Sequence, residues 1–109
     1  MKLLIAVVNK RDCRRLQEAA AAAGLRCTEI GSTGGLLGEG NATLLMEAEG
    51  DEVEAALALI EEHCRAREEV IDAARPETRA HAAGVLVAMT VQVGGARVYV
   101  LDAERVVEV

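Results

Sequence analysis

The sequence is almost without aromatic residues: its 109 residues include one tyrosine, Tyr99, and no phenylalanine or tryptophan. A hydrophobic core must therefore be built from Leu, Val, Ile, Ala and Met, which bury less area per residue than aromatic rings do. Because a small domain with such a core gains stability from association, we expect an oligomer. The lack of rings also removes the stacking platforms on which proteins bind single-stranded RNA or DNA.

The chain also lacks an excess of basic residues. It has 12 lysines and arginines against 18 aspartates and glutamates, a formal net charge of −6. This balance argues against binding to a nucleic-acid polymer, which requires a basic face to replace condensed counterions. A small anionic ligand is compatible with it, because one or two local arginines and backbone N–H groups suffice to hold a phosphate.

There is no Cys-x-x-Cys pair, and the cysteines are odd in number: Cys13, Cys27 and Cys64. We expect three reduced thiols that face the core of a cytoplasmic protein. The opening apolar run, residues 3–8, is too short for a signal sequence or a membrane span. The length fits a single domain over residues 1–109.

The apolar pattern predicts two helices and five strands in the order β-α-β-β-α-β-β. The first helix is capped by Asn9 or Asp12 and ends at Gly24, and the second begins with Asp51 as its cap and ends near residues 65–67. The predicted strands are residues 2–8, which we expect to be buried on both faces, 25–30, 42–48, 85–93 and 96–101.

The second half of the chain holds the only proline, Pro76, within a polar and alanine-rich segment, residues 68–83. We expect a long connection there. Gly94-Gly95 is typical of a two-residue hairpin turn and predicts that the last two strands pair with each other. The first six elements match a ferredoxin-like βαββαβ unit, so the predicted fold class is α+β with an extra C-terminal hairpin strand.

A glycine-rich segment, residues 31–41, contains five glycines among eleven residues and must be a loop. Glycines favour close approach of the backbone to a ligand, and a simple turn between two strands explains them equally well. The segment is neither a dinucleotide fingerprint, because no helix follows, nor a P-loop, because no Lys-Ser or Lys-Thr closes it.

Four stretches of the chain resemble the cyclic-di-AMP receptor family of PII-like signal transduction proteins. They are Gly24-Leu25-Arg26-Cys27-Thr28, Ser32-Thr33-Gly34-Gly35-Leu36-Leu37 with Gly40-Asn41-Ala42-Thr43, Glu62-His63-Cys64-Arg65-Ala66-Arg67-Glu68, and Val93-Gly94-Gly95-Ala96-Arg97-Val98-Tyr99. The resemblance covers nearly the whole chain except residues 70–84.

The resemblance implies a homotrimer of ferredoxin-like subunits that binds cyclic-di-AMP in clefts between neighbours and regulates an unidentified partner protein through its loops. The ligand-binding positions it implies are Arg26, Thr28, Gly35, Leu36, Leu37 and Asn41. The residue types agree in part. Alternation along a strand places Arg26 and Thr28 on one face. Arginine supplies donors for phosphate, and asparagine offers a donor and an acceptor to an adenine edge.

The chain departs from the family at three places. Leu36 replaces a common phenylalanine, Gly38 and Glu39 stand where basic residues are usual, and Glu47 replaces a glycine. The alternative function is therefore a PII-like protein that binds another nucleotide, or none, and acts as a protein-interaction module. No catalytic arrangement is recognisable, and His63, Cys64 and His81 lack the spacing of a zinc site. We expect neither an enzyme nor a metal cofactor.

Overall fold

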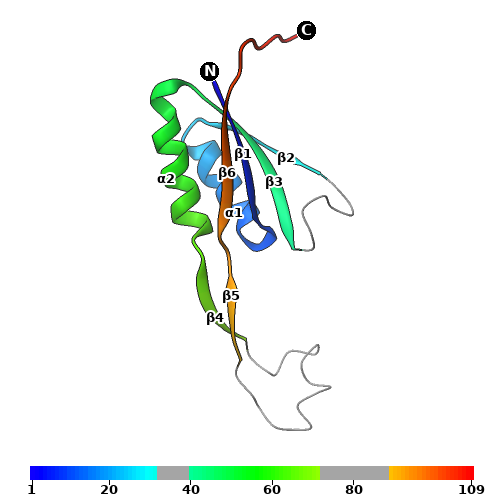
Figure 1. The fold of residues 1–109 in the computed structure, drawn as a ribbon, viewed down its shortest axis with the longest axis vertical. Coiled ribbons are helices and arrows are strands. Elements are labelled where there is room, and N and C mark those ends of the chain that lie inside the picture. The colour runs from blue at the N-terminus through cyan, green and yellow to red at the C-terminus, as the bar shows by residue number, and fades with distance from the viewer. Residues whose placement is uncertain (32–39, 72–88) are drawn as a thin grey trace.

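The computed structural model describes residues 1–31, 40–71 and 89–109, and these form a mixed domain of helices and antiparallel strands (Figure 1). The predicted α and β content is confirmed. The elements are β1 (Lys2–Asn9), α1 (Lys10–Ala22), β2 (Arg26–Ile30), β3 (Asn41–Ala48), a 3₁₀ helix (Gly50–Glu52), α2 (Val53–Cys64), β4 (Arg67–Ile71), β5 (Met89–Val93) and β6 (Ala96–Asp102).

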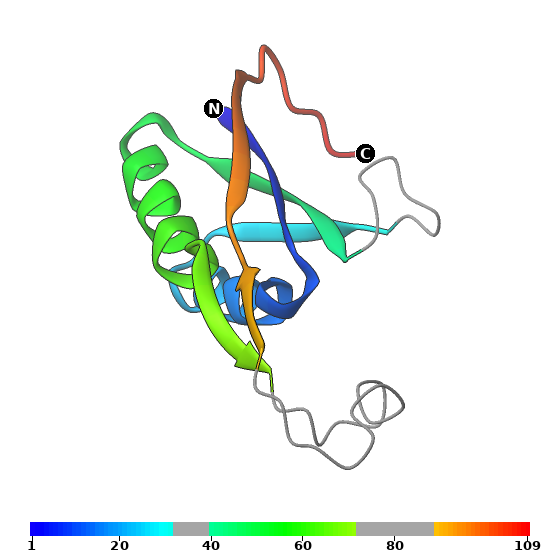
Figure 2. The same ribbon diagram turned by 60° about the horizontal axis from the view of Figure 1, so that its bottom comes forward.

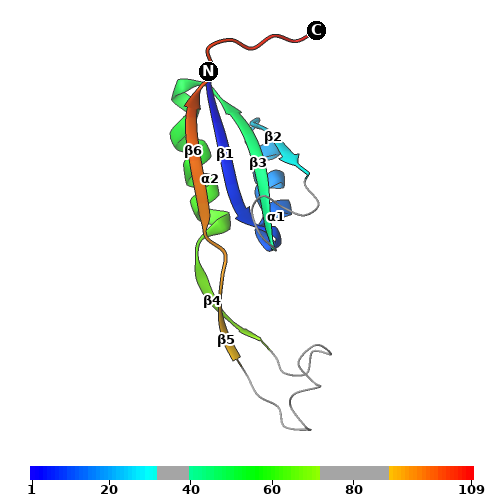
Figure 3. The same cartoon turned by 45° about the vertical axis from the view of Figure 1, so that its right-hand side comes forward.

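The main sheet has four strands in the order β2-β3-β1-β6, and every neighbouring pair is antiparallel. Both helices lie on the same face of this sheet (Figure 3). Along β1 the residues alternate, with Leu4, Ala6 and Val8 buried and the residues between them only partly buried. The prediction of a central strand holds, but the strand is fully buried on one face only, because none of the helices in the described part of the chain crosses the other face.

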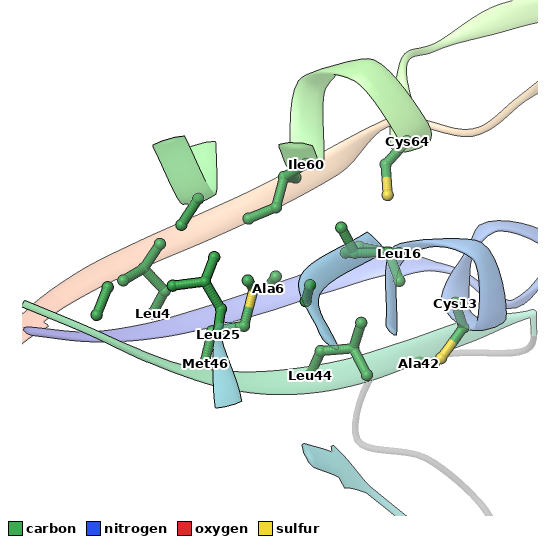
Figure 4. Close-up of a cluster of buried hydrophobic side chains, with 14 residues drawn as sticks. Leu4, Ala6, Cys13, Leu16, Leu25, Ala42, Leu44, Met46, Ile60 and Cys64 are labelled. Carbon is green, nitrogen blue, oxygen red and sulfur yellow. The ribbon is translucent and has the colours of Figure 1, made fainter. Parts of the chain in front are cut away.

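The core lies between this sheet and the two helices, and aliphatic side chains fill it (Figure 4). Leu4, Leu16, Leu44 and Met46 are fully buried. Each such side chain contributes about 1.5–3 kcal/mol by leaving water. Two of the three cysteines, Cys13 and Cys64, are also buried, while Cys27 packs partly against the same cluster. All three face the core, as predicted.

The helix ends follow local side-chain chemistry. Asn9 is the N-cap of α1, and its Oδ1 accepts a hydrogen bond from the backbone N–H of Arg11 at 3.0 Å. Gly24 follows the end of α1 with a φ of 77°, as expected for a residue after a helix. The prediction of Asp51 as the second cap is wrong: a 3₁₀ turn precedes α2, and there the backbone N–H of Glu49 donates to Glu52 Oε1 at 2.8 Å. Helix α2 ends at Cys64 with Arg65 as its C-cap, next to the predicted end at residues 65–67.

The largest correction concerns the last strands. The predicted hairpin through Gly94-Gly95 is wrong, because β5 pairs with β4 and β6 pairs with β1. The strand β4 was not predicted and occupies the start of the expected connection, whose remaining residues, 72–83, lie outside the described residues. Strand β5 begins at Met89, and residues 85–88 of the predicted strand also lie outside. Together β4 and β5 form a two-stranded ribbon that leads away from the sheet (Figure 2).

The two glycines join this ribbon to the sheet. The backbone N–H of Gly95 donates to the carbonyl of Cys64 at 2.6 Å. A Cβ at Gly94 would lie 2.4 Å from the carbonyl oxygen of Arg65. The close passage of β5–β6 beside the end of α2 therefore requires glycine there.

Among the described residues, no helix has both the length and the apolar character that a membrane crossing requires.

Candidate functional site

Arg26 and Thr28 lie side by side on one face of β2, as the alternation predicts. Arg26 stands opposite Glu47 of β3, and Thr28 stands opposite Leu45. The intervening Met46 is fully buried under the helices. Since successive strand residues point to opposite faces, Arg26 and Thr28 point away from the helices, onto the uncovered face of the sheet. Both residues are exposed.

The guanidinium of Arg26 already has anionic neighbours. Its Nη1 lies 3.0 Å from Oε1 of Glu108 and 3.8 Å from Oε2 of Glu47. The Arg26 side chain is 71% exposed, so both ion pairs are solvated and individually weak. Among the described residues two carboxylates nevertheless lie against this guanidinium, so the group formed by Arg26, Glu47 and Glu108 is negative overall.

Asn41 is the first residue of β3 and is exposed. By alternation with the buried Ala42 it shares the uncovered face with Arg26 and Thr28. It lies six residues along β3 from Glu47, the residue opposite Arg26, which is roughly 20 Å in an extended strand. One chain thus places the three predicted side chains on one face but brings only Arg26 and Thr28 together.

The predicted positions Gly35, Leu36 and Leu37 lie outside the described residues. The ends of their loop are described. The loop leaves the sheet after Ile30 and returns at Gly40, whose carbonyl accepts a hydrogen bond from the backbone N–H of Lys10 at 2.7 Å. Both loop ends therefore belong to the Asn41 end of the sheet, opposite to the Arg26 end.

Comparison with known proteins decides the family. The whole chain, residues 1–109, matches the family model described as Cyclic-di-AMP receptor. The chain belongs to the cyclic-di-AMP receptor family. It is also similar to a functionally unknown protein from Pediococcus pentosaceus ATCC 25745, known from a crystal structure, with 30% sequence identity and a TM-score of 0.76. The match covers 99% of this chain and 96% of that one.

This member of the cyclic-di-AMP receptor family also has a charged cleft on its helical side. The cleft, of about 420 Å³, lies where α1, the end of α2 and the start of β4 meet. Its lining residues are Arg15, Ala58, Glu61, Glu62, Arg65 and Arg67. Two of these arginines, Arg15 and Arg67, bind the buried carboxylate of Asp12. None of the residues that line the cleft belongs to β2, and Arg15 and Arg67 hold the fold together through Asp12.

The thiols are poor candidates for chemistry. Burial, and secondarily the charge of Glu29, raises the pKa of Cys13 to about 11, and burial raises the pKa of Cys64 to about 11. Burial also raises the pKa of Cys27. All three therefore remain neutral thiols near pH 7, whereas a nucleophile must be a thiolate. Within residues 1–31, 40–71 and 89–109, no cluster of three or more His, Cys, Asp or Glu side chains could hold a metal ion.

Sequence reasoning missed Glu108, whose carboxylate lies nearer to the Arg26 guanidinium than that of Glu47 does. Glu108 is 82 residues from Arg26 in the chain, and no local pattern joins the two. Glu47 was found as a departure from the family, and antiparallel pairing explains why it matters, because β3 brings it directly opposite Arg26.

Proposed function

We propose that this chain is a PII-like signal transduction protein that binds cyclic-di-AMP, and that it is not an enzyme. The observation that carries the proposal is that Arg26 and Thr28 lie side by side on β2, on the uncovered face of the sheet. The chain that contains them matches the cyclic-di-AMP receptor family over all of residues 1–109. In this proposal β1-α1-β2-β3-α2-β6 is a ferredoxin-like unit, and the β4–β5 ribbon is an insertion before its last strand.

Each predicted side chain has a role that suits a cyclic dinucleotide. The Arg26 guanidinium donates charge-assisted hydrogen bonds to a phosphate, and the Thr28 hydroxyl extends that contact along the same face. The Asn41 amide presents the donor and acceptor that the edge of adenine requires. Backbone N–H groups of Gly35, Leu36 and Leu37 complete the set in this proposal.

The proposed assembly is a homotrimer with the ligand between subunits. Two features support it. Arg26 and Asn41 stand roughly 20 Å apart in one chain, so a neighbour is needed to complete a compact site. The uncovered sheet face also carries apolar side chains: Ile5 stands between Leu45 and Tyr99 across three strands. Tyr99 is 48% exposed, and association would bury it.

Ligand binding, in this proposal, favours one arrangement of the loop between β2 and β3 and of the segment beyond β4, and so changes which partner protein docks. The ligand shifts this equilibrium only by its difference in affinity for the two arrangements.

The carboxylates of Glu47 and Glu108 beside Arg26 favour a second candidate function. A negative local charge opposes a phosphate, which suits a PII-like interaction module that binds another nucleotide or none.

Titration calorimetry separates these functions. The natural chain is titrated with cyclic-di-AMP and, separately, with ATP. Arg26→Ala removes a charge-assisted contact and should weaken cyclic-di-AMP binding roughly ten- to a hundred-fold. The matched control is Arg14→Ala, because Arg14 is 91% exposed on α1.

A separate incubation tests for enzymatic activity. Cyclic-di-AMP recovered intact after long incubation with the protein supports a receptor, and a hydrolysed product would contradict it.

Two results of the titration would contradict the receptor function. Binding of ATP alone, or of neither nucleotide, favours the second candidate. Glu47→Gln then identifies the cause: binding of cyclic-di-AMP that appears only in this variant assigns the loss of function to the Glu47 carboxylate.

A further inference from the structure

The last residues of the chain form a tail that begins beside the N-terminus. After β6 ends at Asp102, the backbone N–H of Ala103 donates to the carbonyl of Met1 at 3.0 Å. Both chain ends lie at the same end of the sheet (Figure 1). Lys2 stands opposite Ala48 in β3, next to the residue that faces Arg26. The tail therefore leaves the sheet at the end where Arg26 lies.

From there the tail reaches the predicted ligand arginine. Glu108 Oε1 lies 3.0 Å from Arg26 Nη1, nearer than the Glu47 carboxylate at 3.8 Å. The contact crosses the full width of the sheet, since the tail follows the edge strand β6 and Arg26 belongs to the opposite edge strand, β2. A carboxylate offers a guanidinium the same kind of acceptor that a phosphate does, two oxygens that share a negative charge.

We propose that the C-terminal tail is an internal competitor for Arg26, in which the Glu108 carboxylate occupies the donor that a phosphate of the ligand would take. The inference rests on the proposed function, in which Arg26 binds that phosphate. A ligand then gains the Arg26 contact only by displacing the tail. Ligand binding and release of the tail are thus coupled, and the penalty on ligand binding grows with the strength of the Arg26–Glu108 pair.

The size of the effect follows from exposure. Arg26 and Glu108 are 71% and 73% exposed, so the pair is a solvated ion pair and the penalty on ligand binding is modest. Removing the competing charge should tighten binding about two- to five-fold at low salt. The gain should shrink as salt is added, because the Debye length falls from about 30 Å at 0.01 M to about 8 Å at 0.15 M.

The test is calorimetric titration of the full chain with cyclic-di-AMP at both salt concentrations. Glu108→Gln keeps the shape of the side chain and removes its charge. Glu104→Gln is the matched control: it removes the same charge from the same tail, and neither an ion pair nor a hydrogen bond links Glu104 to Arg26 in the described part of the chain. We expect a two- to five-fold lower Kd for Glu108→Gln, and a Kd close to the natural value for Glu104→Gln.

A second measurement detects the tail directly. Heteronuclear NOE values for the amides of residues 107–109 should report an ordered tail in the free protein. Addition of cyclic-di-AMP, or the substitution Glu108→Gln, should release it. A tail that becomes more ordered with ligand, or weaker binding by Glu108→Gln, would overturn the competitor role and make Glu108 a ligand contact.

The outcomes keep the two proposals apart. If the natural chain binds cyclic-di-AMP and Glu108→Gln binds it equally well, the competitor role fails and the proposed function stands. If neither protein binds it at either salt concentration, the proposed function fails and the competitor role falls with it.

Discussion

Asp12 and Arg67 are joined across 55 residues of sequence: Arg67 Nη2 lies 2.9 Å from Asp12 Oδ1, and Nη1 lies 3.3 Å from Oδ2. The Asp12 carboxylate is buried, with 1% of its side chain exposed, and also accepts from Arg15 Nη2 at 3.1 Å. The hydrogen bond to Asp12, above all, raises the pKa of Arg67. This pair ties the start of the β4–β5 ribbon to α1, so the ribbon is anchored by charge as well as by strand pairing.

Arg67→Ala should therefore destabilise the fold. In the described part of the chain it leaves the buried Asp12 carboxylate with Arg15 as its remaining side-chain partner, at a cost of about 1–3 kcal/mol. The control is Arg14→Ala, which removes an exposed i,i+4 pair with Glu18 at 3.9 Å and should cost less than about 0.5 kcal/mol. Urea denaturation followed by circular dichroism measures both. Equal midpoints for the two variants would mean that the Asp12–Arg67 pair contributes nothing to stability.

Two glycines allow steric contact to be separated from backbone strain. Gly94 and Gly24 have nearly the same φ, 79° and 77°, but a Cβ would lie 2.4 Å from the Arg65 carbonyl oxygen at Gly94 and would meet nothing within 4 Å at Gly24. Gly24→Ala should cost about 1–2 kcal/mol from conformation alone. Gly94→Ala should cost a further 1–3 kcal/mol, roughly, from the clash. Thermal unfolding of the two variants checks the difference, and equal costs would contradict the close approach.

Gly94 also illustrates where sequence reasoning stopped. A Gly-Gly pair between two apolar runs has the same composition whether those runs pair with each other or each pairs elsewhere. Here β6 takes the free edge of β1, and β5 pairs with β4. The strand β4 begins with three charged residues, Arg67, Glu68 and Glu69, so it lacks the apolar pattern that identifies a strand in a sequence. Its position depends instead on pairing with β5 and on the contact of Arg67 with the distant Asp12.

The candidate site shows the same difference between local patterns, which the sequence reveals, and contacts between distant segments, which it does not. Alternation along one strand was enough to place Arg26 and Thr28 together, because it is a local property of the backbone. The separation of Arg26 from Asn41 depends on the register between β2 and β3, which the sequence alone does not state. The contact of Glu108 with Arg26 depends on the path of a tail after the last strand and was beyond reach.

The buried thiols predict a loss of stability at alkaline pH. Folding raises the pKa of Cys13 and of Cys64 from 9.0 to about 11. The folded state thus favours the protonated thiol, so this stability is complete below pH 9 and is lost as the pH rises from 9 toward 11. At pH 11 each thiol accounts for roughly 2 kcal/mol of the loss.

Urea denaturation at several pH values between 8 and 11, in reducing buffer, measures this dependence. The comparison is with the double variant Cys13→Ala/Cys64→Ala, which lacks both buried thiols. The double variant is expected to start less stable, because both side chains are buried, but to lose less stability as the pH rises. Parallel pH profiles for the two proteins would show that the thiols are not responsible.

The uncovered sheet face gives the sharpest test of association. Tyr99 and Val100 are neighbours on β6 with similar exposure, 48% and 44%, but they point to opposite faces: Tyr99 stands opposite Ile5 on the uncovered face, and Val100 stands opposite the buried Leu4. A lysine at position 99 would place a charge in the proposed interface, where burial without a partner is costly. Position 100 lies outside the proposed interface, on the face that the helices cover, and because Val100 is 44% exposed a lysine there can extend its ammonium group into water.

Light scattering coupled to size exclusion compares Tyr99→Lys with Val100→Lys. The natural chain and Val100→Lys should elute with about three times the 11.5 kDa mass of one chain, and Tyr99→Lys should shift toward that single-chain mass. Circular dichroism of each variant confirms that the sheet is intact before the masses are compared. A natural chain of single-chain mass would refute the trimer, and with it the site completed by a neighbour. Dissociation of both variants alike would mean instead that the edge strand β6, and not the uncovered face, holds the subunits together.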